Sequence, residues 1–159
     1  MEKIEYIIYE PNTVDYQEFL LFLQETDDLI VPPISSRVKL EDYAQKVTKN
    51  ATMFVAKKGG EWIGVEAVYF KPYPDFSFST YLCVKKEFQN GSTVGMELML
   101  RQKRYLKENR TKGLRFAIRK SNVPLLNYHL KTGGRIIAEH AYPDTDIVEV
   151  EMEKIFIKE

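Results

Sequence analysis

The sequence of 159 residues has little cysteine, little histidine and no excess charge of either sign. A single cysteine, Cys83, excludes an internal disulfide, and together with His129 and His140 it makes a poor set of metal ligands. Lysine and arginine together number 23, as do aspartate and glutamate, so the formal net charge is zero. This balance argues against nucleic acid as a partner, because nucleic-acid-binding proteins usually carry a basic excess.

Long apolar runs are also missing. The N-terminal segment MEKIEYIIYE is charged from its second residue and lacks the apolar stretch of a secretory signal. No other run is long enough to cross a bilayer, so we expect no membrane association and a reducing, cytoplasmic setting. The chain is instead rich in core-forming residues, with 44% hydrophobic and 13% aromatic, which is ample for one folded domain over residues 1–159.

Hydrophobic periodicity predicts a mixed α+β fold. Tyr16, Phe19, Leu20 and Leu23 have helical spacing, whereas residues 76–84 alternate as in a strand with two different faces. Strands are predicted at 3–9, at 51–70 (two, around a turn at Gly59-Gly60), and at 76–84, 114–119, 135–140 and 146–155. Helices are predicted from a cap at Asn12 or Thr13 to residue 25, and at 36–50, 94–109 and 122–132. The last strand could pair across a homodimer.

The strand, glycine-containing loop and helix at 76–109 carry the strongest chemical signal. A helix N-terminus presents unpaired backbone N–H groups and a partial positive charge, which together favour phosphate. Gly91 and Gly95 flank this helix start and allow the backbone to approach a ligand closely. A glycine-bearing loop before a helix is more often an ordinary turn, so the loop alone does not define a site.

Two segments resemble motifs of the GNAT acetyltransferases. YLCVKKEFQNGSTVGMEL resembles motif A, and SNVPLLNYHLKTGGRII resembles motif B. The segment 33–54 also resembles a subgroup of these enzymes linked to bacterial polysaccharide synthesis. The resemblance implies an α/β/α-like fold: a twisted mixed sheet of six to seven strands, splayed between the fourth and fifth, with about four flanking helices. It implies transfer of an acetyl group from acetyl-CoA to a primary amine. The alternative is an inactive GNAT-like domain that binds acyl-CoA or another protein.

The resemblance also assigns residues to the cofactor. The backbone of Leu82, Cys83 and Val84 would pair with the pantetheine arm and supply an oxyanion donor. Backbone groups of the loop and helix start would hold the diphosphate. Asn122 would contact the cofactor arm, and Lys131 would either reach a phosphate or stabilise the end of its helix. The loop and helix-start residues of motif A are Gln89, Asn90, Gly91, Ser92, Thr93, Val94 and Gly95.

The chain departs from the family pattern at three places. Its loop is one residue longer, Thr93 stands where glycine is usual, and His129 stands where many members have the tyrosine that protonates the leaving thiolate. Either His129 or the adjacent Tyr128 could be this acid. As an ordinary helix position, His129 would have no chemical role.

Candidates for the base that deprotonates the acceptor lie on the strands. Glu66 is a candidate base, although its place on a strand is more typical of a solvent-facing residue. Asp75 and Tyr81 are weaker candidates of the same kind. Cys83 is not expected to be a nucleophile, because a strand cysteine is usually a small apolar residue of the core.

Overall fold

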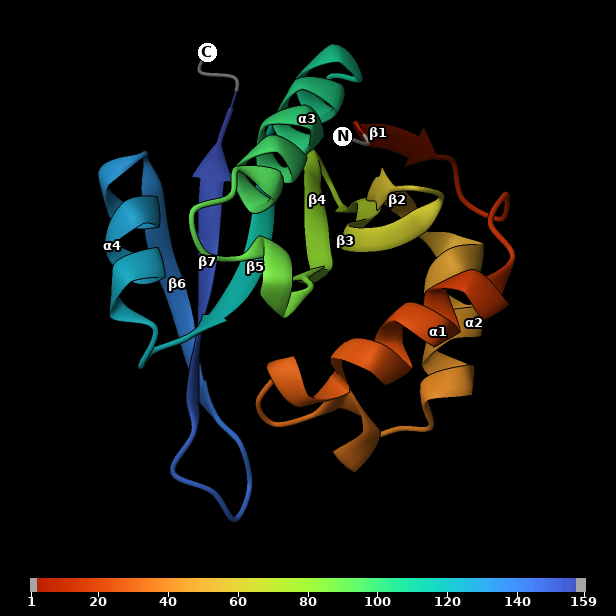
Figure 1. Ribbon diagram of the computed structural model, residues 1–159. Helices are drawn as coiled ribbons and strands as arrows, with labels where there is room; N and C mark the ends of the chain where they lie inside the picture. Colours follow the sequence, from red (N-terminus) through yellow and green to blue (C-terminus); the bar gives the residue numbers. More distant parts are fainter. Residues whose placement is uncertain (1–2, 157–159) are drawn as a thin grey trace. The chain divides into compact units, whose positions relative to one another are not determined.

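The computed structural model describes residues 3–156, within which it places seven strands and four α-helices (Figure 1). The strands form one mixed sheet in the order β1-β2-β3-β4-β5-β7-β6, which confirms the predicted fold class. The strands are β1 (Ile4–Tyr9), β2 (Thr52–Lys58), β3 (Glu61–Tyr73), β4 (Phe76–Val84), β5 (Gly113–Arg119), β6 (Gly134–Ala141) and β7 (Val148–Ile155). The helices are α1 (Tyr16–Thr26), α2 (Leu40–Asn50), α3 (Val94–Glu108) and α4 (Val123–Lys131). None of the described helices has the length and apolar character needed to cross a membrane.

Two compact units share this chain. The N-terminal unit comprises the described residues up to Tyr69 together with Tyr81–Gln102, and the C-terminal unit comprises Phe70–Thr80 and the described residues from Lys103 on. β3, β4 and α3 each continue from one unit into the other. The single domain expected from the sequence stays a prediction.

The N-terminal unit buries one face of its sheet under α1 and α2, which lie side by side (Figure 1). β1 pairs antiparallel with β2, and β2 pairs antiparallel with β3. Helical spacing in α1 and α2 and strand alternation in β2 and β3 bring apolar residues to one core. That core includes Phe19, Phe22, Leu23, Ala44, Val47, Met53, Val55, Val65, Ala67 and Tyr81.

Both helices begin later than the sequence predicts. α1 is capped by Asp15, whose side chain accepts a hydrogen bond from the Gln17 N–H at 3.0 Å. The two predicted caps do not cap the helix. The Thr13 hydroxyl donates to the Glu10 carbonyl, and Asn12 adopts a φ of 64°. α2 begins at Leu40, because Ser36 lies in a separate 3-10 turn, Ile34–Ser36.

The C-terminal unit contains the parallel pairing of β4 with β5, which joins Phe76–Ser79 to Gly113–Phe116. These are the N-terminal parts of both strands, as expected for a sheet that splays between them. β7 pairs antiparallel with both β5 and β6, and α4 lies beside β6 (Figure 1). Because both edges of β7 are used, it is not available for the strand pairing across a dimer that the sequence led us to consider. The outer strands of the described sheet are β1 and β6.

Gly64 on β3 sets how closely the start of α3 approaches the sheet. A Cβ added there would lie 3.1 Å from Leu98 Cδ1, 3.1 Å from Val94 Cγ1 and 3.4 Å from Val84 Cγ2. Glycine therefore lets the first turns of α3 and the end of β4 pack directly on β3. This packing fixes the position of the helix start and of the loop that precedes it.

We expect Gly64→Val to destabilise the protein by about 1–3 kcal/mol, because the added methyl groups overpack this contact. Urea denaturation would measure the change in the free energy of unfolding. Gly95→Ala is the matched control, since a Cβ there meets only Val84 Cγ2, at an ordinary 3.8 Å. Equal stability of Gly64→Val and wild type would show that α3 does not depend on this approach.

Candidate cofactor site at the start of α3

The end of β4 and the turn after it form an ordered approach to α3. Leu82 is exposed and Cys83 is buried, so the strand alternates up to Val84. The Val84 carbonyl accepts a hydrogen bond from Gln89 Nε2 at 2.8 Å, and the Lys85 N–H donates to the Ile63 carbonyl at 2.8 Å. A 3-10 turn, η3 (Lys86–Phe88), follows. The side chain of Gln89, which follows the turn, is thus bonded to the main chain of Val84, which precedes it.

Several backbone N–H groups in the loop and first helical turn have no internal acceptor. Within residues 3–156, no hydrogen bond of good geometry joins the N–H groups of Asn90, Gly91, Ser92, Thr93 or Gly95 to a protein acceptor. The Val94 N–H donates to Ser92 Oγ at 3.2 Å, and the Glu97 N–H to the Thr93 carbonyl at 2.8 Å. The residues from Gln89 to Thr93 are exposed. Free N–H groups at a helix start are the arrangement that favours a phosphate group.

The conformation of the loop explains why Thr93 is tolerated. Gly91 has a φ of 68°, in the left-handed region that glycine enters at little cost. Thr93 is not among the residues with positive φ, so its β-branch meets no backbone strain. The departure from the family pattern at Thr93 therefore does not prevent the loop from forming.

At the start of α4, Asn122 acts as the helix cap. Its side-chain oxygen accepts a hydrogen bond from the Leu125 N–H at 3.4 Å, and Pro124 occupies the second helical position. Asn122 and Lys131 are both exposed, at opposite ends of the helix. Their predicted cofactor contacts stay predictions.

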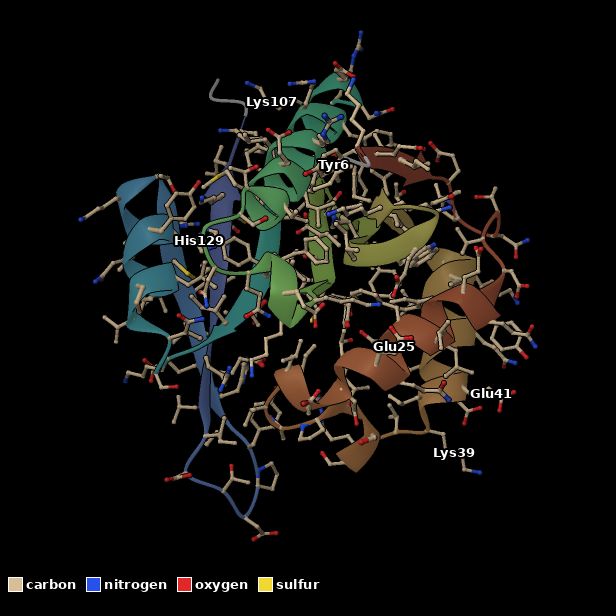
Figure 2. All side chains as sticks on the ribbon, in the orientation of Figure 1. Tyr6, Glu25, Lys39, Glu41, Lys107 and His129 are labelled. Carbon is tan, nitrogen blue, oxygen red and sulfur yellow. The ribbon has the colours of Figure 1, made fainter. Side chains whose placement is uncertain are left out.

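His129 lies on the side of α4 that faces the sheet (Figure 2) and is 7% exposed. Its ring centroid is 4.5 Å from that of Phe116, whose partner on β4 is Ser79. Within the described structure its buried Nδ1 has no hydrogen-bond partner. Burial, and to a lesser extent the Lys154 ammonium, lowers the pKa of His129 to about 4. At pH 7 only about one molecule in a thousand would carry the imidazolium.

Tyr128, the other candidate acid, is half-buried. Its ring lies 5.2 Å from that of His129, and the Lys154 ammonium lies 5.1 Å from its centroid. Its phenolic O–H is a hydrogen-bond donor that can act as a general acid, whereas the neutral His129 imidazole is a far weaker acid than the imidazolium.

The candidate bases differ in accessibility. Glu66 is 2% exposed and shares the face of β3 that Gly64 presents to α3, since strand side chains alternate. The Tyr81 hydroxyl lies 3.2 Å from Thr26 Oγ1 in the core, where burial raises its pKa. Asp75 is exposed in the turn between β3 and β4. Glu66 is therefore not the solvent-facing residue that its strand pattern also allowed.

Sequence reasoning missed the partners of Lys85. Its Nζ lies 2.5 Å from Glu25 Oε2 on α1 and 2.6 Å from Glu61 Oε1 on β3. The two carboxylates are 60 and 24 positions away in the chain, so no local spacing pattern could have revealed them.

Comparisons with known proteins identify the fold. No family model and no curated protein matches the chain. The ribosomal-protein-S18-alanine N-acetyltransferase of Escherichia coli is similar in structure, with a TM-score of 0.76, 15% identity, and coverage of 98% of this chain and 96% of that one. A GNAT-family acetyltransferase of Streptococcus pneumoniae has a TM-score of 0.69 and 17% identity, with 95% and 99% coverage.

A third similar structure was solved with acetyl-CoA. It is a candidate streptothricin acetyltransferase of Bacillus anthracis, with a TM-score of 0.57, 20% identity, and coverage of 68% of this chain and 64% of that one. The chain therefore has the fold of the GNAT acetyltransferases. The subgroup linked to polysaccharide synthesis stays a prediction.

The lowered pKa of His129 predicts a pH-dependent stability. In the unfolded chain the His129 imidazole has a pKa of about 6.5 and is protonated below that pH. In the folded protein the same imidazole stays neutral until the pH falls to about 4. Stability should therefore fall as the pH is lowered from 6.5 to 4, by up to about 3 kcal/mol. Urea denaturation at pH 7 and pH 4.5 would compare wild type with His129→Phe, which should lose less stability over this range. Parallel pH profiles would show that His129 is not held neutral by the fold.

Proposed function

We propose that this protein is an acyl-CoA-dependent N-acyltransferase that moves an acetyl group from acetyl-CoA to a primary amine. The observation that carries the proposal is the set of backbone N–H groups between Asn90 and Gly95 without internal acceptors. They lie at the start of a 15-residue helix, whose dipole adds a partial positive charge. The fold, and the presence of acetyl-CoA in a protein of similar structure, support the same ligand.

In this proposal the loop and the first turn of α3 bind the diphosphate of the cofactor. Leu82–Val84 of β4 would offer backbone groups to the pantetheine arm in the manner of an added strand. The cofactor supplies the activated acyl group. The protein contributes position, together with a backbone N–H that stabilises the oxyanion formed when the amine attacks the thioester.

We infer that Tyr128 protonates the leaving thiolate. The alternative, His129, is buried against Phe116 and neutral at pH 7, so almost none of it is in the acidic imidazolium form. Tyr128 is only half-buried and presents a phenolic O–H donor one position before His129. The choice rests on the different surroundings of two neighbouring side chains.

Glu66 is the proposed base, although its burial limits how an acceptor reaches it. At 2% exposure, it would accept a proton from a bound amine through water molecules rather than by direct contact. An acceptor that arrives already deprotonated would not need it. The acceptor is proposed only as a primary amine, with amino sugars, polyamines, antibiotics and protein N-termini as the classes to test.

The diphosphate site predicts that Gly95→Pro weakens acetyl-CoA binding. Proline removes the Gly95 N–H, and a helix of this chain already holds proline at the same second position, Pro124 in α4. Losing one hydrogen bond to a charged group costs about 1.5–3 kcal/mol, so Kd should rise at least about tenfold. Isothermal titration calorimetry with acetyl-CoA would measure it.

Gly95→Ala is the matched control, because alanine keeps the N–H and its Cβ meets only ordinary contacts. Its Kd should stay within about threefold of wild type, since the hydrogen bond to the phosphate is retained. Wild-type protein that shows no heat of binding and no thermal stabilisation by millimolar acetyl-CoA would refute the proposed function.

The assignment of the acid predicts different effects of Tyr128→Phe and His129→Phe. Loss of a general acid lowers kcat by about 100-fold or more, which is expected for Tyr128→Phe only. Release of CoA thiol would be followed with acetyl-CoA and a panel containing an amino sugar, a polyamine and a short peptide. A large loss in His129→Phe alone would reverse the assignment. Binding of acetyl-CoA without thiol release with any amine would favour a non-catalytic acyl-CoA-binding protein.

A further inference from the structure

Lys85 joins three elements of the N-terminal unit at the start of the proposed diphosphate loop. It is the first residue after β4, and its side chain is 13% exposed. Its ammonium lies between Glu25, in the last turn of α1 (labelled in Figure 2), and Glu61, the first residue of β3. Its backbone N–H donates to the Ile63 carbonyl of β3, and its carbonyl accepts from the Phe88 N–H at 2.9 Å. Both its side chain and its main chain are therefore held.

The charges of Glu25 and Glu61 favour the protonated form of the Lys85 side chain. Burial alone would lower the pKa of Lys85, but the hydrogen bonds and charges of Glu25 and Glu61 outweigh burial and raise it. The Lys85 hydrogen bond in turn lowers the pKa of Glu61. The last turn of α1 has no basic residue of its own, so Lys85 also supplies the positive charge that a helix C-terminus favours.

Lys85 is poorly placed to bind the cofactor with its own charge. Its ammonium already contacts two carboxylates, and together with them it forms a cluster with a net charge of about −1, which would repel a diphosphate. Its effect on an anionic ligand must therefore pass through the loop that it anchors. That loop contains the 3-10 turn and ends in the N–H groups from Asn90 to Gly95.

We propose that Lys85 is a positioning residue, which holds the start of the loop against α1 and β3 so that its N–H groups are aligned before acetyl-CoA binds. This inference rests on the proposed function, because it concerns the same diphosphate site. A loop ordered in advance binds more tightly than one that must be ordered by its ligand. We call the ion pairs of Lys85 with Glu25 and Glu61 the anchor of the loop. Through Glu25 the anchor also links the loop to α1.

Lys85→Met tests the anchor, because methionine keeps an unbranched apolar stem and removes the charge. We expect Kd for acetyl-CoA to rise on the order of tenfold, as the loop loses its ordered start. The kcat at saturating acetyl-CoA should change less than about twofold, because Lys85 makes no contact with the reacting groups in this proposal. Lys85→Arg should restore Kd to within about threefold, since a guanidinium can hold two carboxylates.

Two further variants separate positioning from general stability. Glu61→Gln removes one arm of the anchor at an exposed residue and should raise Kd about twofold to threefold without unfolding the protein. Lys120→Met removes an exposed ion pair with Glu139 in the C-terminal unit and should leave Kd unchanged. Circular dichroism would confirm that each variant is folded.

The outcomes distinguish this inference from the proposed function. If wild type binds acetyl-CoA and Lys85→Met binds it equally well, the positioning role is wrong and the proposed function stands. If Lys85→Met is destabilised but its Kd at a temperature where it is folded matches that of wild type, Lys85 is structural only. Wild type that does not bind acetyl-CoA overturns both the proposed function and the role of Lys85.

Discussion

The proposed site depends on backbone N–H groups that lack internal acceptors while the helix behind them is closely packed on β3. An N–H group in water loses little by lacking an internal acceptor, so leaving Asn90 to Thr93 open at the surface does not threaten stability. The difficulty is to keep such groups pointing in one direction. In this chain the glycine at 64 lets α3 sit close to β3, and Gln89 closes the turn that precedes the open groups. Close packing of α3 on β3 thus holds the open N–H groups of the proposed site in one place.

Much of the fold could be predicted from short-range patterns. Alternation in β4, helical spacing in α1 and the paired glycines at 59 and 60 each depend on residues that are neighbours in sequence. Helix starts were predicted less well, because several residues near Asp15 can cap a helix. Asp15 caps α1 since the Thr13 hydroxyl is bonded to the Glu10 carbonyl and Asn12 has turned into the left-handed region. Such competition is decided by geometry that a spacing rule does not contain.

The positions of the candidate site residues could be predicted from the sequence, but their charge states and accessibility could not. Position 129 was predicted to lie near the chemistry. Its imidazole is neutral because it is buried, packed against Phe116 of β5, and to a lesser extent because of the Lys154 ammonium. The burial of Glu66 likewise arises because its face of β3 lies under α3, rather than toward solvent. The partners of Lys85 come from α1 and from the start of β3. In each case a long-range contact determines the charge state or accessibility of a residue whose type was known.

The only tryptophan of the chain, Trp62, lies in the core of the N-terminal unit, stacked on Tyr9 with ring centroids 6.3 Å apart. Selectively excited tryptophan emission will therefore report the melting of that unit alone, whereas the amide circular dichroism signal comes from both. This native probe needs no label, so a comparison of the two signals during denaturation gives a direct measure of how cooperatively the halves of the molecule unfold.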